Sequence, residues 1–554
     1  MIEDRVRSLL QQALDRCVAD GVLPREAAGD IALDRPPRAE LGDLSSNLAL
    51  TTAPRADMSP RELAQALLDR LEAPADLVRE VSVAGPGFLN FFLHPTWLWQ
   101  SLAEMLRRPD QYGRSDLGRG KRVNVEFVSA NPVGPLHIGN ARGGPLGDAL
   151  ASLLEWTGHR VTREYLVNDG PDNTQLLLFG KSVKLRYLEA LGRQVEFPQD
   201  WYGADYVKRY AQLIVERHGE AYADDERPDL FYADLVLEDV VEDLRRDCAA
   251  VGIEFDVWFH ERSLLESAEV DRVYARLHEL AATYEKDDAL WLKTTDHGDD
   301  EDRVVRRRTG ATTYLITDAA YHASKFERGH ELLIDVWGPD HHGHVLPTKA
   351  AVACLGYPEE DFEIIMHQTV RLMRGGEVVK MSKRRGEVVT LRELVEEVGP
   401  DVTRFFFLMR SSDAHLDFDL DLAVERSEKN PVYYVQYAHA RMCSIFREAQ
   451  ERGVELEPAT APLERLEHED ELALLRRLAD FPGEVASAAR SRAPHRLTGY
   501  VRELAADFHQ FYTSCRVLGD DADLTQARLA LLRGTQIVLR NALSILGISA
   551  PERM

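Results

Sequence analysis

Two short motifs constrain the fold of this chain more than any other feature. The first, Asn131–Asn140 (NPVGPLHIGN), follows an apolar run at Val123–Val128 and precedes apolar residues at helical spacing in Leu146–Trp156. This pattern predicts a strand-to-helix turn, where backbone N–H groups and the helix dipole favour phosphate. The second, Lys380–Arg384 (KMSKR), lies between glycines. Two lysines on such a hinged segment suit negative charge that develops on a phosphate leaving group.

The strand-like runs of the middle of the chain alternate with helical patterns. This alternation predicts an α/β fold, a Rossmann-type doubly wound parallel sheet over residues 111–427. An acidic stretch of helical pattern, about 176–300, is expected to be inserted in it. The predicted strands are Val123–Val128, Arg160–Val167, Thr312–Thr317, Leu332–Val336 and Phe362–His367.

Two further domains flank this region. Residues 1–110 open with an amphipathic helical pattern and end in two strand-like runs joined by Gly85-Pro86-Gly87, which predicts a small α+β domain. Beyond Ser427 the apolar period is helical to the end, so 428–554 is expected to be all-α.

Composition narrows the setting of the protein. The five cysteines are far apart, which favours reduced, buried thiols over disulfides or a Cys-based zinc site. No apolar run is long enough for a membrane span, and the first residues lack the pattern of a signal peptide, so a cytoplasmic protein is expected. The net charge of −26 disfavours binding to a polyanion overall, but the distribution of charge matters more than its total.

Several longer sequence motifs accompany these two. With them, the chain resembles the class I aminoacyl-tRNA synthetases, specifically the arginyl-tRNA synthetases. His137–Asn140 and Lys380–Arg384 are similar to the "HIGH" and "KMSKS" motifs of that class. The resemblance extends from about Gly42 to Met554. The other matching words are EFVSANP at Glu126–Pro132, YLVND at Tyr165–Asp169, WGPDHHG at Trp337–Gly343 and YYVQYAHAR at Tyr433–Arg441.

The resemblance implies an activity and its partners. It implies ligation of L-arginine to its tRNA through an arginyl-adenylate, with ATP as the energy source and Mg²⁺ accompanying ATP. An N-terminal domain that touches the tRNA elbow and a helical anticodon-binding domain are also implied. We expect no structural metal, because adjacent histidines such as His341 and His342 rarely share one and no ligand spacing accompanies them. We also expect a monomer.

Catalysis in such a reaction consists mainly of positioning and charge neutralisation. The first motif has Asn140 where the family pattern usually has a second histidine, and Asn can donate a hydrogen bond but cannot become cationic. A satisfied structural role is the alternative for His137. The predicted catalytic residues are His137, Asn140, Lys380, Ser382 and Lys383, and the predicted ATP-binding residues are Pro132, Gly134, His137, Gly139, Asn140, Gly338, Asp340 and Met381.

A guanidinium substrate requires planar acceptors in a desolvated pocket. Glu126 and Asp318 are the predicted carboxylates, since each ends a predicted strand at the crevice where open α/β sheets bind ligands, and Tyr314 can cover the pocket. A helix N-cap is the alternative for Asp318. The resemblance adds Asn131 and His341 as contacts of the amino acid.

The C-terminal part offers aromatic and basic residues for tRNA. Tyr433, Tyr434 and Tyr437 could stack on single-stranded bases, but aromatics at helical spacing are equally typical of a core. The resemblance implies that Arg441 and the chain end at Met554 also approach tRNA. Residues 472–540 contain 10 arginines and 7 acidic residues, which indicates either a locally basic face or ordinary solvated positions.

The residues present disfavour two alternative functions. A class I synthetase for another amino acid, such as cysteine, would need a thiolate zinc site that the cysteine spacing denies. A synthetase-like RNA-binding protein without activity would have decayed motifs, whereas His137, Lys380 and Lys383 are present.

Overall fold

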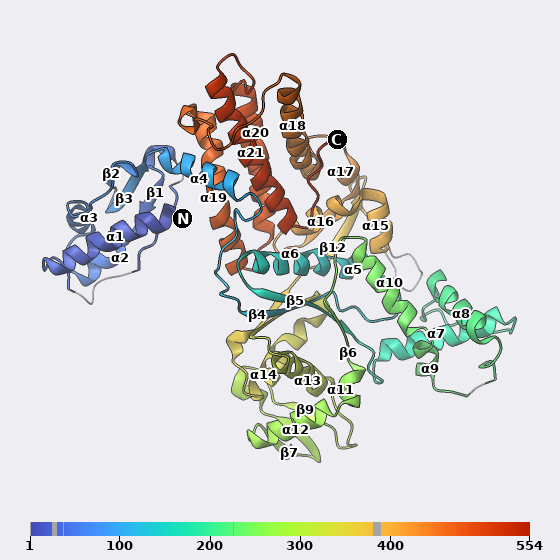
Figure 1. Cartoon of the computed structure of the whole chain (residues 1–554). Helices are drawn as coiled ribbons and strands as arrows, with labels where there is room; N and C mark the ends of the chain where they lie inside the picture. The colour runs from blue at the N-terminus through green and yellow to red at the C-terminus, as the bar shows by residue number, and fades with distance from the viewer. Residues whose placement is uncertain (1, 25–29, 37, 225, 380–388) are drawn as a thin grey trace. The chain divides into compact units, whose positions relative to one another are not determined.

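The computed structural model describes residues 2–24, 30–36, 38–224, 226–379 and 389–554 (Figure 1). The chain forms two compact units, each built from separate stretches of sequence. The first unit comprises Met1–Gly113, Arg441–Gly483 and Leu504–Val538, and the second comprises Arg114–Ala440, Glu484–Glu503 and Leu539–Met554.

The second unit is built on a five-stranded parallel sheet in the order β11-β10-β4-β5-β6. Its central strand β4 is buried at every residue after the first, as expected of a strand covered on both faces. The doubly wound α/β fold predicted from the sequence is therefore confirmed. The strands are β4 (Arg122–Phe127), β5 (Arg160–Val167), β6 (Val257–His260), β10 (Leu332–Trp337) and β11 (Phe362–Met366).

Helices cover both faces of this sheet. Figure 1 shows α6 (Gly143–Trp156) on one face and α13 (Tyr314–Glu327) with α14 (Val345–Cys354) on the other. Gly147 allows α6 to approach the sheet closely, because a Cβ there would lie 2.2 Å from the Phe127 ring. The predicted strand, turn and helix around the first motif are thus observed, with the short α5 (Ile138–Ala141) between β4 and α6.

Four of the five predicted strands are confirmed, and Thr312–Thr317 is wrong. Its β-branched residues favour a strand, but Thr313 is the extended N-cap of α13, which begins at Tyr314. Ile316, Ala319 and Ala323 recur at helical spacing and are all buried, so packing overrides local propensity.

Two connections leave the sheet between β5 and β10. The first is helical, as the helical pattern of the acidic stretch predicts. Strand β6 interrupts the acidic stretch and was not predicted. The elements of the first connection are α7 (Thr174–Ala190), α8 (Asp205–His218), α9 (Asp229–Asp234) and α10 (Leu237–Ala249). Those of the second, which precede α13, are α11 (Arg262–Glu266), α12 (Glu269–Glu279), β7 (Thr283–Lys286), β8 (Ala289–Leu292) and β9 (Arg303–Arg306).

A small sheet in the order β13-β12-β14 carries the chain toward and away from the second motif. The motif itself, Lys380–Arg384, lies outside the described residues. The surrounding elements are β12 (Val370–Arg374), β13 (Glu377–Val378), α15 (Leu391–Val398), α16 (Pro400–Leu408), β14 (Leu416–Asp419) and α17 (Leu420–Val424).

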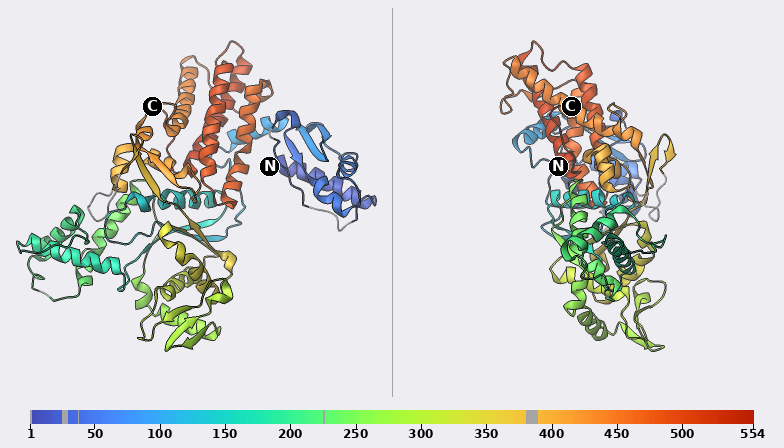
Figure 2. Two further views of the ribbon diagram at one scale, coloured as in Figure 1. Left: turned by 180° about the vertical axis from the view of Figure 1, so that it is seen from behind. Right: turned by 90° about the vertical axis from the view of Figure 1, so that its right-hand side faces the viewer.

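The first unit contains the predicted α+β module. An antiparallel sheet, β1-β3-β2, includes the expected hairpin, whose turn uses positive φ at Gly85 and Gly87. The strands and the helices packed on them are drawn in blue in Figure 2. The elements are α1 (Ile2–Ala19), β1 (Leu44–Ser46), α2 (Leu48–Thr52), α3 (Pro60–Leu68), β2 (Val78–Ala84), β3 (Phe88–Leu93) and α4 (Thr96–Arg107).

The C-terminal part is all-helical, as predicted, and each of its long helices is divided between the two units. Within the first unit, the Trp99 indole donates a hydrogen bond to the Leu466 carbonyl over 3.3 Å and fastens α4 to this part. The long helices are α18 (Pro431–Glu451), α19 (Glu469–Arg490), α20 (His495–Ser514) and α21 (Ala522–Ile545).

All five cysteines are buried, as predicted. None of the helices in the described part of the chain combines the length and the apolar composition that crossing a bilayer requires.

Candidate active site

The predicted site residues of the second unit gather where the parallel strands end. Asn131 follows β4, and the segment from Gly338 to His341 follows β10. Helix α13 precedes β10, and its first turns carry Tyr314 and Asp318. Because parallel strands direct all their carboxyl ends to one edge of the sheet, these groups share the edge at which open α/β sheets bind ligands.

The first motif forms a tight entry into α5. His137 is its N-cap with extended backbone, and the Asn140 N–H donates to the His137 carbonyl over 2.9 Å. A Cβ on Gly139 would lie 3.1 Å from the His137 ring, so glycine leaves room for the imidazole. Gly134 has φ of +151°, and a Cβ there would meet the Tyr206 ring at 2.6 Å. The motif glycines thus serve close packing around His137.

The structure joins the first motif to the residues that come directly after the second. Leu391 N–H donates to the Leu136 carbonyl over 2.8 Å, and Ile138 N–H donates to the Val389 carbonyl over 3.3 Å. His137 and Thr390 form an antiparallel bridge between these segments. Lys380, Met381, Ser382 and Lys383 lie outside the described residues.

Asp247, which was not predicted, reinforces this junction from α10. Its buried carboxylate accepts from the Leu136 N–H over 3.0 Å and from the Arg392 guanidinium over 2.6 Å. One side chain therefore contacts both the first motif and the helix that follows the second.

Arg142, at the start of α6, makes a second connection. Its side chain is 1% exposed and donates only to backbone carbonyls in the described contacts, and burial lowers its pKa to about 10. These contacts join α6 to the ends of the segment that includes β12 and precedes β14. The acceptors are the carbonyls of Gln368, Arg410, Ser411, Ser412 and Ala414.

Asp318 lies on α13 one turn after Tyr314, so both side chains lie on one helix face. The N-cap alternative for Asp318 is wrong, because Thr313 is the N-cap. Burial raises the pKa of the Asp318 carboxyl. Tyr314 is 54% exposed, and its hydroxyl donates to the Asp172 carbonyl over 2.8 Å, which bridges α13 to the loop after β5.

Glu261, at the end of β6, is a carboxylate that sequence reasoning missed. Burial and the Asp318 carboxylate raise its pKa to about 7, and it accepts from the Gly170 N–H over 3.2 Å. Two carboxyl groups whose ionised forms are disfavoured by burial form a site that a cation would stabilise. The aromatic and β-branched run before Glu261 was a signal for the strand that places it.

Glu126 lies deeper than predicted. It is 3% exposed, and both oxygens are engaged, Oε1 by the Ser129 hydroxyl at 2.9 Å and Oε2 by the Lys325 ammonium at 2.6 Å. It ends a strand as expected but points into the interior, whereas Asp318 belongs to a helix. The prediction that Glu126 receives the guanidinium is corrected accordingly: these contacts leave it no exposed oxygen.

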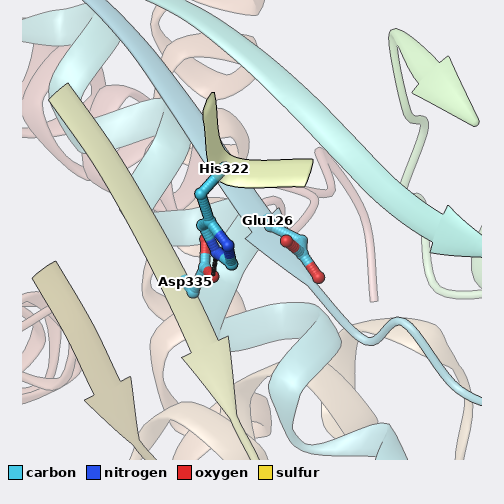
Figure 3. Close-up of side chains that lie close together, drawn as sticks. All are labelled: Glu126, His322 and Asp335. Atoms are coloured by element: carbon cyan, nitrogen blue, oxygen red, sulfur yellow. Dashed lines mark hydrogen bonds and ion pairs between the residues drawn. The ribbon is translucent and has the colours of Figure 1, made fainter. Parts of the chain in front are cut away.

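Figure 3 shows Glu126, His322 and Asp335 close together, with ligand atoms within 4.8 Å of one another, a spacing that could hold a metal ion. Lys325 lies 3.0 Å from Asp335 as well as 2.6 Å from Glu126, so the chain itself supplies a cation here. Although burial opposes its charge, these carboxylates raise the pKa of Lys325 to about 12. The cluster is therefore read as a buried ion-pair network.

The residues after β10 face solvent more openly. Asp340 and His341 are exposed, and the His341 ring centroid lies 5.7 Å from that of Trp337. His367, also unpredicted, is buried beside Gly338 and Gly143, and a Cβ on Gly143 would lie 3.2 Å from its Nε2. Burial lowers the pKa of His367 to about 4, so its imidazole is neutral at neutral pH.

The tyrosines of α18 are not core residues in the sense that Val432 and Val435 are. Tyr433 and Tyr434 are half-buried, Tyr437 is 39% exposed, and the Tyr433 and Tyr437 rings stack with centroids 6.2 Å apart. The chain end also returns to this helix, because His439 Nδ1 bonds the Pro551 carbonyl at 2.9 Å, and Met554 is 56% exposed. Arg441 is exposed and donates to the Tyr512 hydroxyl over 2.7 Å.

Three family models match the chain. They are described as the arginyl tRNA synthetase N terminal domain (residues 4–93), the tRNA synthetases class I (R) catalytic domain (101–404) and the DALR anticodon binding domain (435–554). A protein of Carboxydothermus hydrogenoformans named arginine–tRNA ligase is 48% identical over 97% of this chain and 96% of its own. The chain belongs to the arginyl-tRNA synthetase family.

Further comparisons agree with this membership. The arginine–tRNA ligase of Syntrophotalea carbinolica is 48% identical over the full length of both chains. The solved arginyl-tRNA synthetase of Thermus thermophilus shares the fold, with a TM-score of 0.78 over the full length of both chains at 23% identity. A class I catalytic domain implies that the synthetase uses ATP.

Proposed function

We propose that this synthetase ligates L-arginine to its cognate tRNA through an arginyl-adenylate, with release of AMP and pyrophosphate. The junction of Leu136 and Ile138 with Val389 and Leu391 carries the proposal. It brings the first motif against the segment that begins five residues after the second motif, at the edge of the sheet where open α/β folds bind ligands. The identification of the amino acid and of the tRNA rests on the names of the arginine–tRNA ligase relatives.

Adenylate formation requires positioning of ATP and stabilisation of its leaving group. Pro132, Gly134, Gly139, Gly338 and Met381 are proposed to line the nucleotide together with His137, Asn140 and Asp340, and Lys380, Ser382 and Lys383 to act on the leaving group. Mg²⁺ prefers oxygen ligands and binds largely through phosphates and water, and the exposed Asp340 carboxylate beside Gly338 fits such an ion. When bound, the ion would neutralise phosphate charge.

Arginine is proposed to bind with its guanidinium toward Asp318 and Glu261 and under Tyr314. The raised pKa values of both carboxyl groups support this assignment, because burial disfavours their charge and a bound cation would stabilise it. Asn131 and His341 are proposed to contact the amino-acid backbone.

Binding of tRNA is assigned to the domains on either side of the catalytic domain. The proposed boundaries are 1–110 for the N-terminal domain, 111–427 for the catalytic domain with an insertion at about 176–300, and 428–554 for the anticodon-binding domain. Residues 1–110 are proposed to touch the tRNA elbow. The exposure of Tyr437 and the return of the chain end to α18 support anticodon contacts by Tyr433, Tyr434, Tyr437, Arg441 and Met554. We propose a monomer that works where translation takes place, in the cytoplasm.

Exchange of labelled pyrophosphate into ATP tests this function. Each of the twenty amino acids is supplied to the full-length protein with and without total tRNA. We expect exchange with arginine and with none of the other nineteen amino acids, followed by charging of tRNA. Exchange driven by a different amino acid would overturn the assignment of substrate, and no exchange with any amino acid would favour the inactive RNA-binding alternative.

A further inference from the structure

A strained turn follows the central strand β4. Val128 has φ of +70° and Ser129 has φ of +40°, and the Ser129 N–H donates to the Phe127 carbonyl over 3.0 Å. This is a three-residue γ-turn with positive φ, which is rare and strained. A β-branched residue in this region is a genuine outlier. Among the non-glycine residues with positive φ in the described ranges, Val128 is the only β-branched one.

The turn keeps this shape because its surroundings hold it from several sides. The Ser129 hydroxyl accepts from the Leu166 N–H over 3.1 Å and donates to Glu126 over 2.9 Å. The Ser129 carbonyl accepts from the Asn168 amide over 3.1 Å. The following carbonyl, of Ala130, accepts from the Tyr165 hydroxyl over 3.0 Å.

The contact with Glu126 differs from the others because it leads to a buried charge network. Glu126 Oε2 is paired with Lys325, Lys325 with Asp335, and Asp335 with His322 over 2.7 Å. Figure 3 shows the acidic and histidine members of this network side by side. Because Lys325 and Asp335 are fully buried, Glu126 has little freedom to rotate away from Ser129.

Asn131 comes two residues after this turn, and its side chain continues the same set of contacts. Its Oδ1 accepts from the Asn173 amide over 2.9 Å. Any rotation of the turn would therefore displace the residue proposed to contact the amino acid. We infer that Glu126 and Lys325 are positioning residues, which hold the strained turn and through it Asn131 in the geometry that receives arginine. This inference rests on the proposed function of the site.

Steady-state pyrophosphate exchange on the full-length protein tests the inference. Lys325→Met keeps most of the side-chain volume and removes the charge. Without the Lys325–Glu126 ion pair that holds the turn, the KM for arginine should rise roughly 5- to 150-fold. This corresponds to about 1–3 kcal/mol at 1.4 kcal/mol per tenfold, the scale of one strained residue. The KM for ATP should stay within about twofold, the error of independent sites.

Arg328→Met is the matched control. Arg328 is the C-cap of the same helix and pairs with the buried Glu164 over 2.7 Å, and its described hydrogen bonds involve neither Glu126 nor the turn. It should lower the melting temperature and leave the KM for arginine within about twofold. A general softening of the sheet would instead raise the KM for arginine in both variants.

A double-mutant cycle separates positioning from stability, even where Lys325→Met does not fold. Glu126→Gln removes the charge that pairs with Lys325 while preserving the shape of the side chain. Val128→Gly removes the backbone strain of the turn, since glycine adopts positive φ without a Cβ penalty. Coupling through the turn requires the combined rise in KM for arginine to fall well short of the product of the single rises.

The possible outcomes are distinct. Multiplicative effects of Glu126→Gln and Val128→Gly, or an unchanged KM for arginine in folded Lys325→Met, would overturn the inference. A wild-type protein without arginine-dependent exchange would overturn the proposed function instead.

Discussion

Asp247→Asn tests whether one buried carboxylate holds the first motif and helix α15 together. The change preserves size but removes the charge that faces Arg392, and it replaces one acceptor oxygen with an amide donor. In the structure Asp247 accepts from Leu136 at 3.0 Å and from Arg392 at 2.6 Å. An asparagine oxygen can satisfy only one of these donors well, and the amide then faces the other.

The magnitude follows from these two contacts. A hydrogen bond to a charged group contributes about 1.5–3 kcal/mol, and a buried donor left without an acceptor costs about 1–3 kcal/mol. The side chain of Arg392 is 46% exposed, so water can replace much of its lost contact. If Leu136 keeps the oxygen the loss is near the lower values, and we expect a decrease of about 2–3 kcal/mol in the free energy of unfolding.

Activity should fall in addition, because the first motif and the segment after the second would no longer be held at a fixed distance. Urea unfolding and pyrophosphate exchange measure the two effects. Asp243→Asn is the control, since Asp243 lies one turn earlier on α10, is buried, and contacts Arg209 and Tyr210. The reasoning would be refuted if both variants lost equal stability and the folded enzyme kept full kcat in both.

Three further predictions concern other groups. Glu261 has a pKa of about 7, so the calorimetric affinity for arginine should weaken as pH falls below 7, approaching tenfold per pH unit; Glu261→Gln should flatten this dependence, and a flat wild-type profile would contradict it. The same raised pKa stabilises the fold at low pH, an effect lost as pH rises through 7. Lys383→Ala should lower kcat for adenylate formation, because the activation free energy should rise by roughly 2–4 kcal/mol, with little change in the KM for arginine. Unaltered turnover would exclude a role for the charge of Lys383. Tyr437→Ala should raise the KM for tRNA roughly 5- to 150-fold if a base stacks on it, with the salt dependence unchanged; a large fall in melting temperature with normal tRNA affinity would instead make Tyr437 structural.

Local patterns in the sequence predicted much of the fold. The glycines of residues 85–87 predicted the hairpin of β2 and β3, and the run before Asn131 predicted β4 and the turn into α5 and α6. These features depend on contacts between residues close in sequence. The prediction at Thr312–Thr317 failed because β-branched residues favour strands, while burial of Ile316 and Ala319 in a helix depends on distant partners.

The candidate site was predictable only where its residues belong to motifs. His137 was found by its neighbours in the first motif, and Asn131 by a resemblance. Asp318 was chosen as the end of a predicted strand that proved to be a helix, and Tyr314 by its place before it. Glu261 was missed because the four-residue strand before it was not recognised. The orientation of Glu126 was misjudged, since its partner Lys325 is 199 residues away and forms no pattern with it.

The sequence by itself determined the class of the protein, the parallel sheet and the chemistry of its motifs. The tertiary structure decided which carboxylates face a substrate, which are neutralised inside, and that Asp247 contacts Leu136 and Arg392 at separations of 111 and 145 residues. The physical reason is one of range. Periodicity and turn chemistry act over a few residues of one segment, whereas the charge of a buried group is set by whichever distant segments the fold packs around it.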